Sequence, residues 1–304
     1  MKLTRRELGK LTLTALPAAV LLGGNSRAWA QAANKPNSRF AGVQIGMNVP
    51  YNFGGRDMNA DELLDRCVKL NISAVEMRSQ PVESFLGSPA ADGQKADAAE
   101  VRTFRTALKM DRVAPFRRKF EDAGVMIEVV KFDGLYNMSD AEVDYCFNLA
   151  RALGARAISC EIDVTHTQRI GQFADKHKLM VGYHGHASTT PEHWEAAFSQ
   201  ARYNGANLDL GHFLAGNNTS PVPFLKQHHA RITHVHVKDR KLKEGPNMPF
   251  GQGDTPIKEA LQTIRDNKWP IQATIEFEYP VPAGSDRMIE LAKCVEYCRQ
   301  ALLS

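Results

Sequence analysis

Short apolar segments alternate with amphipathic helical segments along the chain, and this alternation restricts the fold more than any other feature of the sequence. Such alternation builds parallel sheets, because each helix covers the sheet and returns the chain to the edge where the next strand begins. Eight strand–helix units are the number that closes a (β/α)8 barrel. The predicted strands cover residues 43–48, 74–78, 126–131, 157–163, 180–184, 206–210, 232–238 and 273–278. The predicted helices cover residues 60–70, 96–123, 140–153, 167–177, 191–201, 222–227, 257–267 and 286–302.

Residues with special backbone or capping roles stand at the ends of several predicted helices. Gly124, Gly154 and Gly205 each lie between a helical segment and a strand, where C-cap glycines are common. Ser139 and Thr190 occupy positions where N-caps are expected. These local signals agree with the helix boundaries that the apolar periodicity predicts.

The chain is long enough for one large barrel. No Gly-rich dinucleotide loop follows the first strand, which disfavours a doubly wound open sheet. We therefore predict a single-domain α/β protein, a (β/α)8 TIM barrel over residues 41–304, preceded by a flexible segment over residues 31–40. Two long loops are expected over residues 79–95 and 240–253, since both are rich in glycine and proline.

The first thirty residues have the features of a removable export signal. Arg5 and Arg6 lie in a charged start, an apolar run covers residues 11–22, and residues 28–30 read Ala-Trp-Ala, a small-residue cleavage pattern. The run is too short to cross a bilayer comfortably, so no membrane span is expected after cleavage. The paired arginines resemble a twin-arginine signal. We predict a leader over residues 1–30 and a periplasmic or otherwise exported protein, with a general secretory signal or an N-terminal anchor as the alternative.

The positive charge of the chain belongs to this leader. The whole chain has 38 Lys+Arg and 34 Asp+Glu, of which the leader contains five and one, so 33 of each remain. A balanced chain offers no sign of a basic face for nucleic acid, and no nucleic-acid partner is expected. The cysteines form no C-x-x-C pair, and we predict that most are buried thiols: Cys67, Cys146, Cys160, Cys294 and Cys298.

Acidic and imidazole side chains lie late in several predicted strands, where strands covered by helices should be apolar. Because side chains alternate along a strand, His234, His236 and Lys238 share one face, and Glu276 and Glu278 share another. The apolar neighbours then face the helices and the polar residues line the barrel, whose active sites lie at the C-terminal strand ends. Carboxylates buried together repel one another unless a cation compensates them. Mixed carboxylate and imidazole ligands suit a divalent transition metal.

These motifs resemble the xylose isomerase-like TIM barrel superfamily, which includes sugar isomerases, ketose epimerases and sugar dehydratases. The resemblance covers nearly the whole chain after the leader. It implies a metal ion held by a carboxylate from a middle strand together with Asp209, His236 and Glu276. The motifs that carry it are Leu-Asp-Leu-Gly-His at 208–212, His-Val-His-Val-Lys-Asp at 234–239, Gly-Gln-Gly at 251–253 and Thr-Ile-Glu at 274–276.

The chain departs from the family pattern at the end of the fifth strand. Many members carry Glu-Asn-His or Glu-Thr-His there, whereas this chain has His184-Gly185-His186. Glu161, on the neighbouring strand, can supply the missing carboxylate, and His184 is the alternate ligand. The expected ion is one divalent metal, with Mn favoured and Co, Zn, Fe or Mg as alternatives. The predicted ligands are Glu161, Asp209, His236 and Glu276.

The resemblance implies proton transfer beside the carbonyl of a small-molecule sugar or glycoside. A metal ion polarises the carbonyl, and a positioned base removes the neighbouring proton. The end result is isomerisation, epimerisation or elimination, with elimination somewhat favoured. The predicted catalytic residues are His186, Lys238 and Glu161. The predicted substrate contacts are Glu76, Arg78, His184, His212 and His234, with a structural ion pair as the alternative for Glu76 and Arg78.

The His-x-His pair also resembles the branch that contains inosose dehydratases and exported enzymes acting on 3-keto sugars and 3-keto glycosides. No phosphate-binding glycine loop is visible, so an unphosphorylated substrate is expected. A metal-dependent endonuclease of the apurinic type is an alternative, but it should carry a basic face. A non-catalytic periplasmic sugar-binding barrel is another, but it would be expected to lose the metal ligands. The sequence is compatible with a homo-oligomer.

The leader predicts that export depends on both arginines. Changing Arg5 and Arg6 to lysine should leave the precursor uncleaved in the cytoplasm, because the twin-arginine route recognises that pair. The measurement is fractionation of cells that express either form, followed by detection of the cleaved chain. Unchanged export of the variant would exclude this route and favour the general secretory one.

Overall fold

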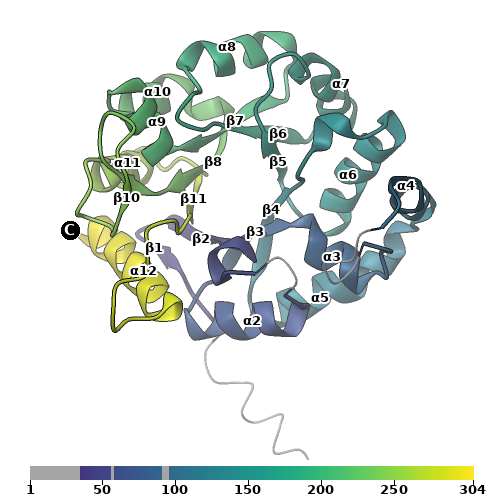
Figure 1. Cartoon of the computed structure of the whole chain (residues 1–304), viewed down its shortest axis with the longest axis horizontal. Coiled ribbons are helices and arrows are strands. Elements are labelled where there is room, and N and C mark those ends of the chain that lie inside the picture. Colours follow the sequence, from purple (N-terminus) through teal and green to yellow (C-terminus); the bar gives the residue numbers. More distant parts are fainter. Residues whose placement is uncertain (1–34, 56–57, 91–95) are drawn as a thin grey trace, which may run out of the picture. The chain divides into compact units, whose positions relative to one another are not determined.

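The computed structural model describes residues 35–55, 58–90 and 96–304, so the predicted leader lies outside the described residues. Eight parallel strands close into a barrel, the inner ring of Figure 1, with helices around it. The predicted (β/α)8 fold is confirmed. In order around the barrel the strands are β2 Val43–Val49, β3 Ala74–Arg78, β4 Met126–Lys131, β5 Ala157–Glu161, β6 Met180–His184, β7 Asn204–Asp209, β8 Ile232–Val237 and β11 Gln272–Ile275.

The helices that surround the barrel match most of the predicted ones. The predicted helix over residues 96–123 is broken into two: the first ends at Ala107, a 3-10 helix covers Met110–Val113, and Pro115 lies in the first turn of the second, where proline is tolerated. Two helices lie where none was expected: one follows β7, and one lies in the predicted loop 79–95. The α-helices are α2 Ala60–Lys69, α3 Ser79–Phe85, α4 Ala98–Ala107, α5 Ala114–Ala123, α6 Asp140–Ala152, α7 Thr167–His177, α8 Pro191–Gln200, α9 Leu210–Asn217, α10 Val222–His228, α11 Ile257–Asp266 and α12 Arg287–Leu303.

The predicted caps are largely confirmed. Ser139 and Thr190 are N-caps with reciprocal capping boxes. Gly124 and Gly154 have φ values of 81° and 82°, which glycine adopts without a steric cost. Gly205 is not a C-cap; it lies within β7, where an added Cβ would be 2.6 Å from the carbonyl oxygen of Arg231. Close packing of backbone segments therefore explains this glycine.

Two further segments differ from the sequence prediction. The expected flexible segment 31–40 includes β1, Arg39–Phe40, which pairs antiparallel with β2. Ser38 beside it is fully buried and hydrogen-bonds the carbonyl of Ile45 at 2.6 Å. The expected loop 240–253 contains a short antiparallel pair of β9 Asp239–Arg240 and β10 Asn247–Met248. No helix among the described residues is both long enough and apolar enough to span a membrane.

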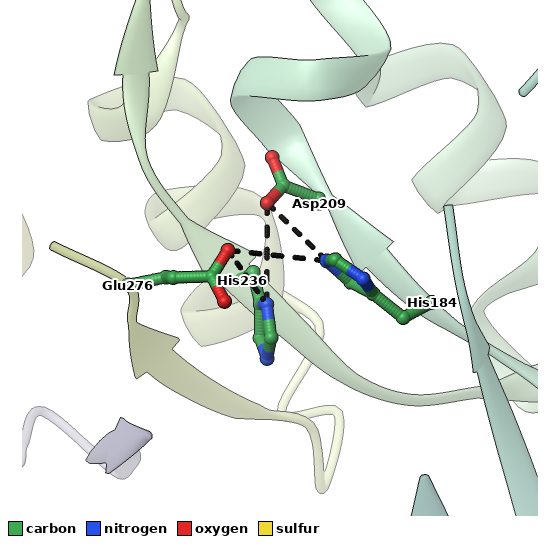
Figure 2. Close-up of side chains that lie close together, drawn as sticks. All are labelled: His184, Asp209, His236 and Glu276. Carbon is green, nitrogen blue, oxygen red and sulfur yellow. Dashed lines mark ion pairs between the residues drawn. The ribbon is translucent and has the colours of Figure 1, made fainter. Parts of the chain in front are cut away.

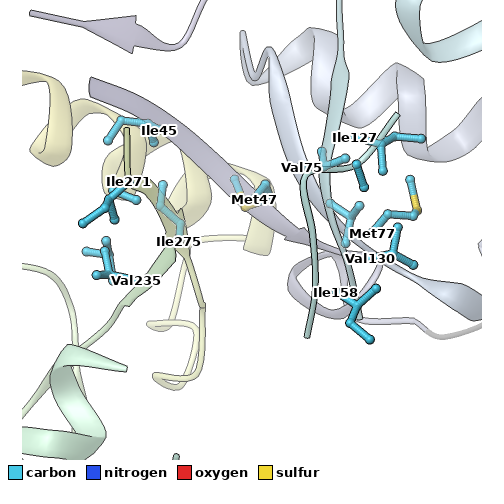
Figure 3. Packing of buried hydrophobic residues seen from close by; sticks show 14 of the residues in the cluster. Ile45, Met47, Val75, Met77, Ile127, Val130, Ile158, Val235, Ile271 and Ile275 are labelled. Carbon is cyan, nitrogen blue, oxygen red and sulfur yellow. The ribbon is translucent and has the colours of Figure 1, made fainter. Parts of the chain in front are cut away.

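The two faces of each barrel strand carry different kinds of side chain. Ile45, Met47 and Val235 are fully buried in the apolar cluster between strands and helices, part of which Figure 3 shows. Polar residues alternate with these and point into the barrel. Glu76 of β3 contacts His236 of β8 across the interior, although these strands are not neighbours in the sheet. The barrel is therefore apolar outside and polar inside, and the strand ends position the site.

All five cysteines are free and buried, as the sequence predicts for most of them. Burial raises the pKa of the Cys67 and Cys294 thiols to about 12. Because the thiolate is the reactive form, we expect no thiol of the native protein to react with Ellman's reagent within minutes at pH 8. All five should react in guanidinium chloride. One equivalent reacting quickly in the folded protein would contradict this burial.

Candidate metal centre

Four side chains from four successive barrel strands converge at the C-terminal mouth, and we call them the tetrad: His184, Asp209, His236 and Glu276. Figure 2 shows them pointing toward a common centre. One nitrogen or oxygen from each lies within 4.8 Å of the others, and all four residues are buried. The strand ends place them there, because His184 and Asp209 terminate β6 and β7, His236 is in β8, and Glu276 follows β11.

The converging atoms have no hydrogen-bond partner among the described residues: His184 Nε2, Asp209 Oδ2, His236 Nδ1 and Glu276 Oε2. Lys238 forms ion pairs with the two carboxylate oxygens, but buried polar atoms that lack hydrogen bonds are costly, so four of them facing one centre need a common explanation. His236 Nδ1 lies 3.3 Å from Glu276 Oε2, and His184 Nε2 lies 3.6 Å from Asp209 Oδ2. Two imidazoles and two carboxylates form a donor set that fits a divalent metal such as Mn, Zn or Fe.

Two further carboxylates hold the imidazoles of the tetrad from behind. His184 Nδ1 lies 2.9 Å from Glu161 Oε2, and His236 Nε2 lies 2.5 Å from Glu76 Oε2. An ionised carboxylate only accepts, so in each imidazole the nitrogen that faces the carboxylate carries the proton. The other nitrogen would then be free to present its lone pair to a metal ion at the tetrad centre. Carboxylate–imidazole pairs of this kind fix the orientation of metal ligands and increase their basicity.

Glu161 therefore does not take the position that we predicted for it. Its Oε2 faces His184 and His186, and its Oε1 accepts from Lys131 Nζ at 2.6 Å. These contacts hold Oε2 against the two imidazoles and Oε1 against the Lys131 ammonium. The alternate ligand, His184, completes the tetrad in its place.

Electrostatic interactions keep Glu161 and His236 ionised, although burial opposes their charges. Burial raises the pKa of Glu161, but hydrogen bonds from His184 and His186 outweigh it and hold this pKa well below its usual range. Burial lowers the pKa of His236, but Glu276 and Glu76 raise it to about 10. In the metal-free protein a proton on His236 thus partly offsets the carboxylates around it.

Lys238 also compensates the acidic side of the tetrad. Its Nζ lies 2.7 Å from Glu276 Oε2, 2.7 Å from Glu278 Oε2 and 3.2 Å from Asp209 Oδ2. Burial opposes its charge, but these carboxylates raise the pKa of the ammonium above its ordinary value. His212 Nε2 lies 2.9 Å from the same ammonium. Lys238 and His212 therefore lie at the mouth, beside the tetrad.

The other predicted substrate contacts are placed less favourably. Glu76 and His234 are fully buried beneath the tetrad, with 3.3 Å between Glu76 Oε1 and His234 Nε2, and a substrate at the mouth has no access to them. Arg78 is bound by both oxygens of Asp133, at 2.9 and 2.7 Å. The alternative role of Glu76 and Arg78, as members of structural ion pairs, thus fits better. They do not pair with each other: Glu76 pairs with His236, and Arg78 pairs with Asp133.

His186 is the predicted catalytic residue that is most open to solvent, with 55% of its side chain exposed. Its Nε2 lies 2.7 Å from Glu161 Oε2, and this hydrogen bond raises the pKa of the imidazole. Sequence reasoning missed Lys131, the buried cation that holds the other oxygen of Glu161. Lys131 ends β4, so the polar strand-end pattern contained the signal.

A cavity of about 510 Å³ opens beside the tetrad at the same mouth. Glu278, which contacts Lys238, forms part of its wall. Asp239 fixes the loop that carries another wall residue, Asn247, by accepting from the backbone nitrogens of Gly251 and Gly253 at 2.8 and 2.9 Å. Among the described residues the lining is Tyr51, Gly54, Gly55, Asn247, Phe277, Glu278 and Arg287.

Comparison with known proteins agrees with the barrel fold. The sequence matches the family described as Xylose isomerase-like TIM barrel over residues 64–297, and the chain belongs to this family. No curated protein matches it in sequence.

Several solved structures have the same fold. A xylose isomerase domain protein from Planctomyces limnophilus is 17% identical, with a TM-score of 0.60 over 86% of this chain and 98% of that one. A xylose isomerase-like TIM barrel protein from Mycobacterium smegmatis, in complex with magnesium, is 15% identical, with a TM-score of 0.57 over 86% and 96%. The apo form of 3-keto-D-glucoside 4-epimerase from E. coli is 9% identical, with a TM-score of 0.59 over 85% and 99%.

The tetrad predicts that metal binding depends on both its members and their supports. Glu276→Gln should remove a charged ligand and abolish retention of Mn²⁺ or Zn²⁺ through purification. Glu76→Gln should weaken binding about 10- to 100-fold, since it loosens the orientation of His236. Elemental analysis and competition with a chromogenic chelator measure the two effects. Glu290→Gln, which changes a buried carboxylate of α12 outside the tetrad, is the control and should retain the metal. Equal metal content in Glu276→Gln and the unaltered protein would refute the site.

Proposed function

We propose that the protein is a metal-dependent isomerase, epimerase or carbon–oxygen lyase that moves a proton beside the carbonyl of an unphosphorylated sugar. The observation that carries this proposal is the tetrad, whose four converging nitrogen and oxygen atoms lie next to an exposed imidazole at the barrel mouth. His184, Asp209, His236 and Glu276 would hold one divalent ion. When bound, the ion would polarise a substrate carbonyl and make the adjacent C–H more acidic.

His186 is the proposed base. Because its Nε2–H is bonded to the ionised Glu161, the neutral ring has Nδ1 as its acceptor, and no described residue contacts that atom. The carboxylate stabilises the imidazolium that forms when the ring takes a proton, as the orienting acid of a catalytic triad does. Glu161 is less suited to act as the base itself, since its hydrogen bonds hold its pKa well below the usual range.

Lys238 is the proposed electrostatic partner of the substrate. Its ammonium is held charged by Glu276, Glu278 and Asp209, so its positive charge can stabilise an oxyanion that develops beside the tetrad. His212 lies on its other side, and burial lowers the pKa of this imidazole to about 4. A neutral His212 adds a hydrogen-bonding group without further positive charge.

The proposed substrate is a 3-keto sugar or 3-keto glycoside, and the proposed location is outside the cytoplasm. The His184-Gly185-His186 sequence supports the first, together with the fold shared with a 3-keto-D-glucoside 4-epimerase. The paired arginines and the apolar run of the leader support export. The balanced charge after the leader weighs against an endonuclease, and the intact donor set of the tetrad weighs against a non-catalytic sugar-binding barrel.

Exchange of the substrate C–H with solvent tests the reaction class directly. Methyl 3-keto-glucoside in D2O should exchange the hydrogen beside its carbonyl when the metal-loaded protein is added, as proton NMR detects. His186→Ala should slow exchange by about 10²- to 10⁴-fold, the usual effect of losing a general base, while metal content is unchanged. His229→Ala, an exposed histidine stacked on Trp269, is the matched control and should exchange normally.

Two outcomes would change this assignment. Exchange that persists in His186→Ala but disappears in Lys238→Ala would make Lys238 the base. The absence of exchange and product across a panel of 3-keto sugars, ketoses and inososes would refute the reaction class.

A further inference from the structure

We propose that the cavity beside the tetrad binds a second sugar ring, joined to the ring that reacts. This inference rests on the proposed function, since it assigns the reacting ring to the tetrad. The cavity wall contains no tetrad residue, so its volume of about 510 Å³ is additional to the metal centre. A volume of this size lies within the range of small-molecule sites. The substrate would thus be a disaccharide or a glycoside with a ring-sized aglycone.

Glu278 connects the cavity to the tetrad. Lys238 Nζ lies 2.7 Å from Glu278 Oε2 in the cavity wall and 2.7 Å from Glu276 Oε2 in the tetrad. Phe277, between these two glutamates in the sequence, also lines the cavity. The Lys238 ammonium therefore contacts both the cavity wall and the tetrad. Two linked sugar rings could occupy the cavity and the tetrad at the same time.

The cavity wall is organised before any ligand arrives. Tyr51 Oη donates to Glu278 Oε1 at 2.7 Å, and Asn247 Nδ2 donates to Glu278 Oε2 at 3.3 Å. The Arg287 guanidinium lies 5.0 Å from the centroid of the Phe277 ring and donates through Nη1 to the carbonyl of Asn52 at 3.2 Å. Rotamers fixed in this way reduce the entropy that binding would otherwise cost.

The chemistry of the wall matches a neutral polyol better than an anion. Arg287 and Asn247 supply donors, and Glu278 supplies acceptors, so both kinds of partner are available to sugar hydroxyls, each of which donates and accepts. Tyr51, which is partly exposed, supplies aromatic surface for the apolar face of a ring. The negative charge of Glu278 offsets the positive charge of Arg287, and this disfavours binding of a phosphate or nucleotide.

Gly55 offers a way to fill the cavity without disturbing the tetrad. An added Cβ at this position meets no atom of the described residues within 4 Å, and its φ lies outside the left-handed region. Gly55→Phe should therefore occupy cavity space at little backbone cost, whereas Gly55→Ala is too small to do so and is the matched control. Arg287→Met is a second variant, which keeps an apolar side chain over Phe277 but removes the donors.

The test compares 3-keto-cellobiose with methyl 3-keto-glucoside in the solvent-exchange assay. The kcat/KM of the unaltered protein should be about tenfold or more higher for the two-ring substrate than for the one-ring substrate. A factor of ten corresponds to about 1.4 kcal/mol of added binding free energy. Gly55→Phe should reduce this ratio to about one, Arg287→Met should lower it, and Gly55→Ala should keep it. Equal kcat/KM values in the unaltered protein, or an unchanged ratio in a folded Gly55→Phe, would overturn the proposal.

A binding measurement separates this proposal from the reaction class. Cellobiose and glucose, which lack the keto group, are titrated into the full-length mature protein by calorimetry or ligand-observed NMR. Tighter binding of cellobiose that is lost in Gly55→Phe supports the subsite even if no substrate exchanges its hydrogen. Equal binding of the two sugars, or equal cellobiose binding by both proteins, would overturn the subsite even if exchange is observed.

Discussion

Burying ionised groups is costly unless each one is compensated, and the interior of this barrel contains several of them. Lys131 and Lys238 are almost completely buried, as are Glu76 and Asp209. Some of these charges are offset between neighbouring strands, as in Lys131 with Glu161, and others across the barrel, as in Glu76 of β3 with His236 of β8. This internal network determines which imidazole nitrogen faces the mouth. The remaining structure, the ring of helices and the apolar cluster, supports the strands that hold the network in register.

Two carboxylates with the same function stand behind the tetrad. Glu161 holds His184 and Glu76 holds His236, each through the ring nitrogen that faces away from the centre. Glu161 also holds His186, so one carboxylate joins a proposed metal ligand to the proposed base. Lys131 binds the opposite oxygen of Glu161 and limits its movement. A displacement of Glu161 would therefore affect both metal binding and proton transfer.

The mouth of the barrel depends on loops that the strands anchor. Asp239 begins β9, two positions after the end of β8, and accepts from backbone nitrogens of the Gly-Gln-Gly segment, where an added Cβ at Gly253 would lie 1.9 Å from Asp239 Oδ1. This contact gives the glycine at position 253 a physical reason, because the chain passes directly against the carboxylate. The same loop carries Asn247 to the cavity, so the strand that supplies His236 also positions part of the cavity wall.

The sequence by itself determined the eight strands, nearly all of the helices around them and the side chains that face the barrel. Which side chains face the barrel depends only on the two-residue period of each strand. His234, His236 and Lys238 must therefore share a face wherever the strand lies. Capping at Ser139 and Thr190 was visible for the same reason, since a cap depends on residues three positions apart. The break before Pro115 was present in the sequence but was hidden by a continuous apolar periodicity.

Tertiary structure decided which of the inward-facing residues meet. The sequence offered Glu161 and His184 as alternatives, because both end neighbouring strands and both could reach the centre. The choice depends on contacts with Lys131 and His186, which turn the Glu161 carboxylate aside. Glu76 and His236 are separated by 160 positions, and only barrel closure brings them to 2.5 Å. Strand periodicity gives the direction of a side chain, but its partners across the barrel follow from closure and from the balance of buried charge.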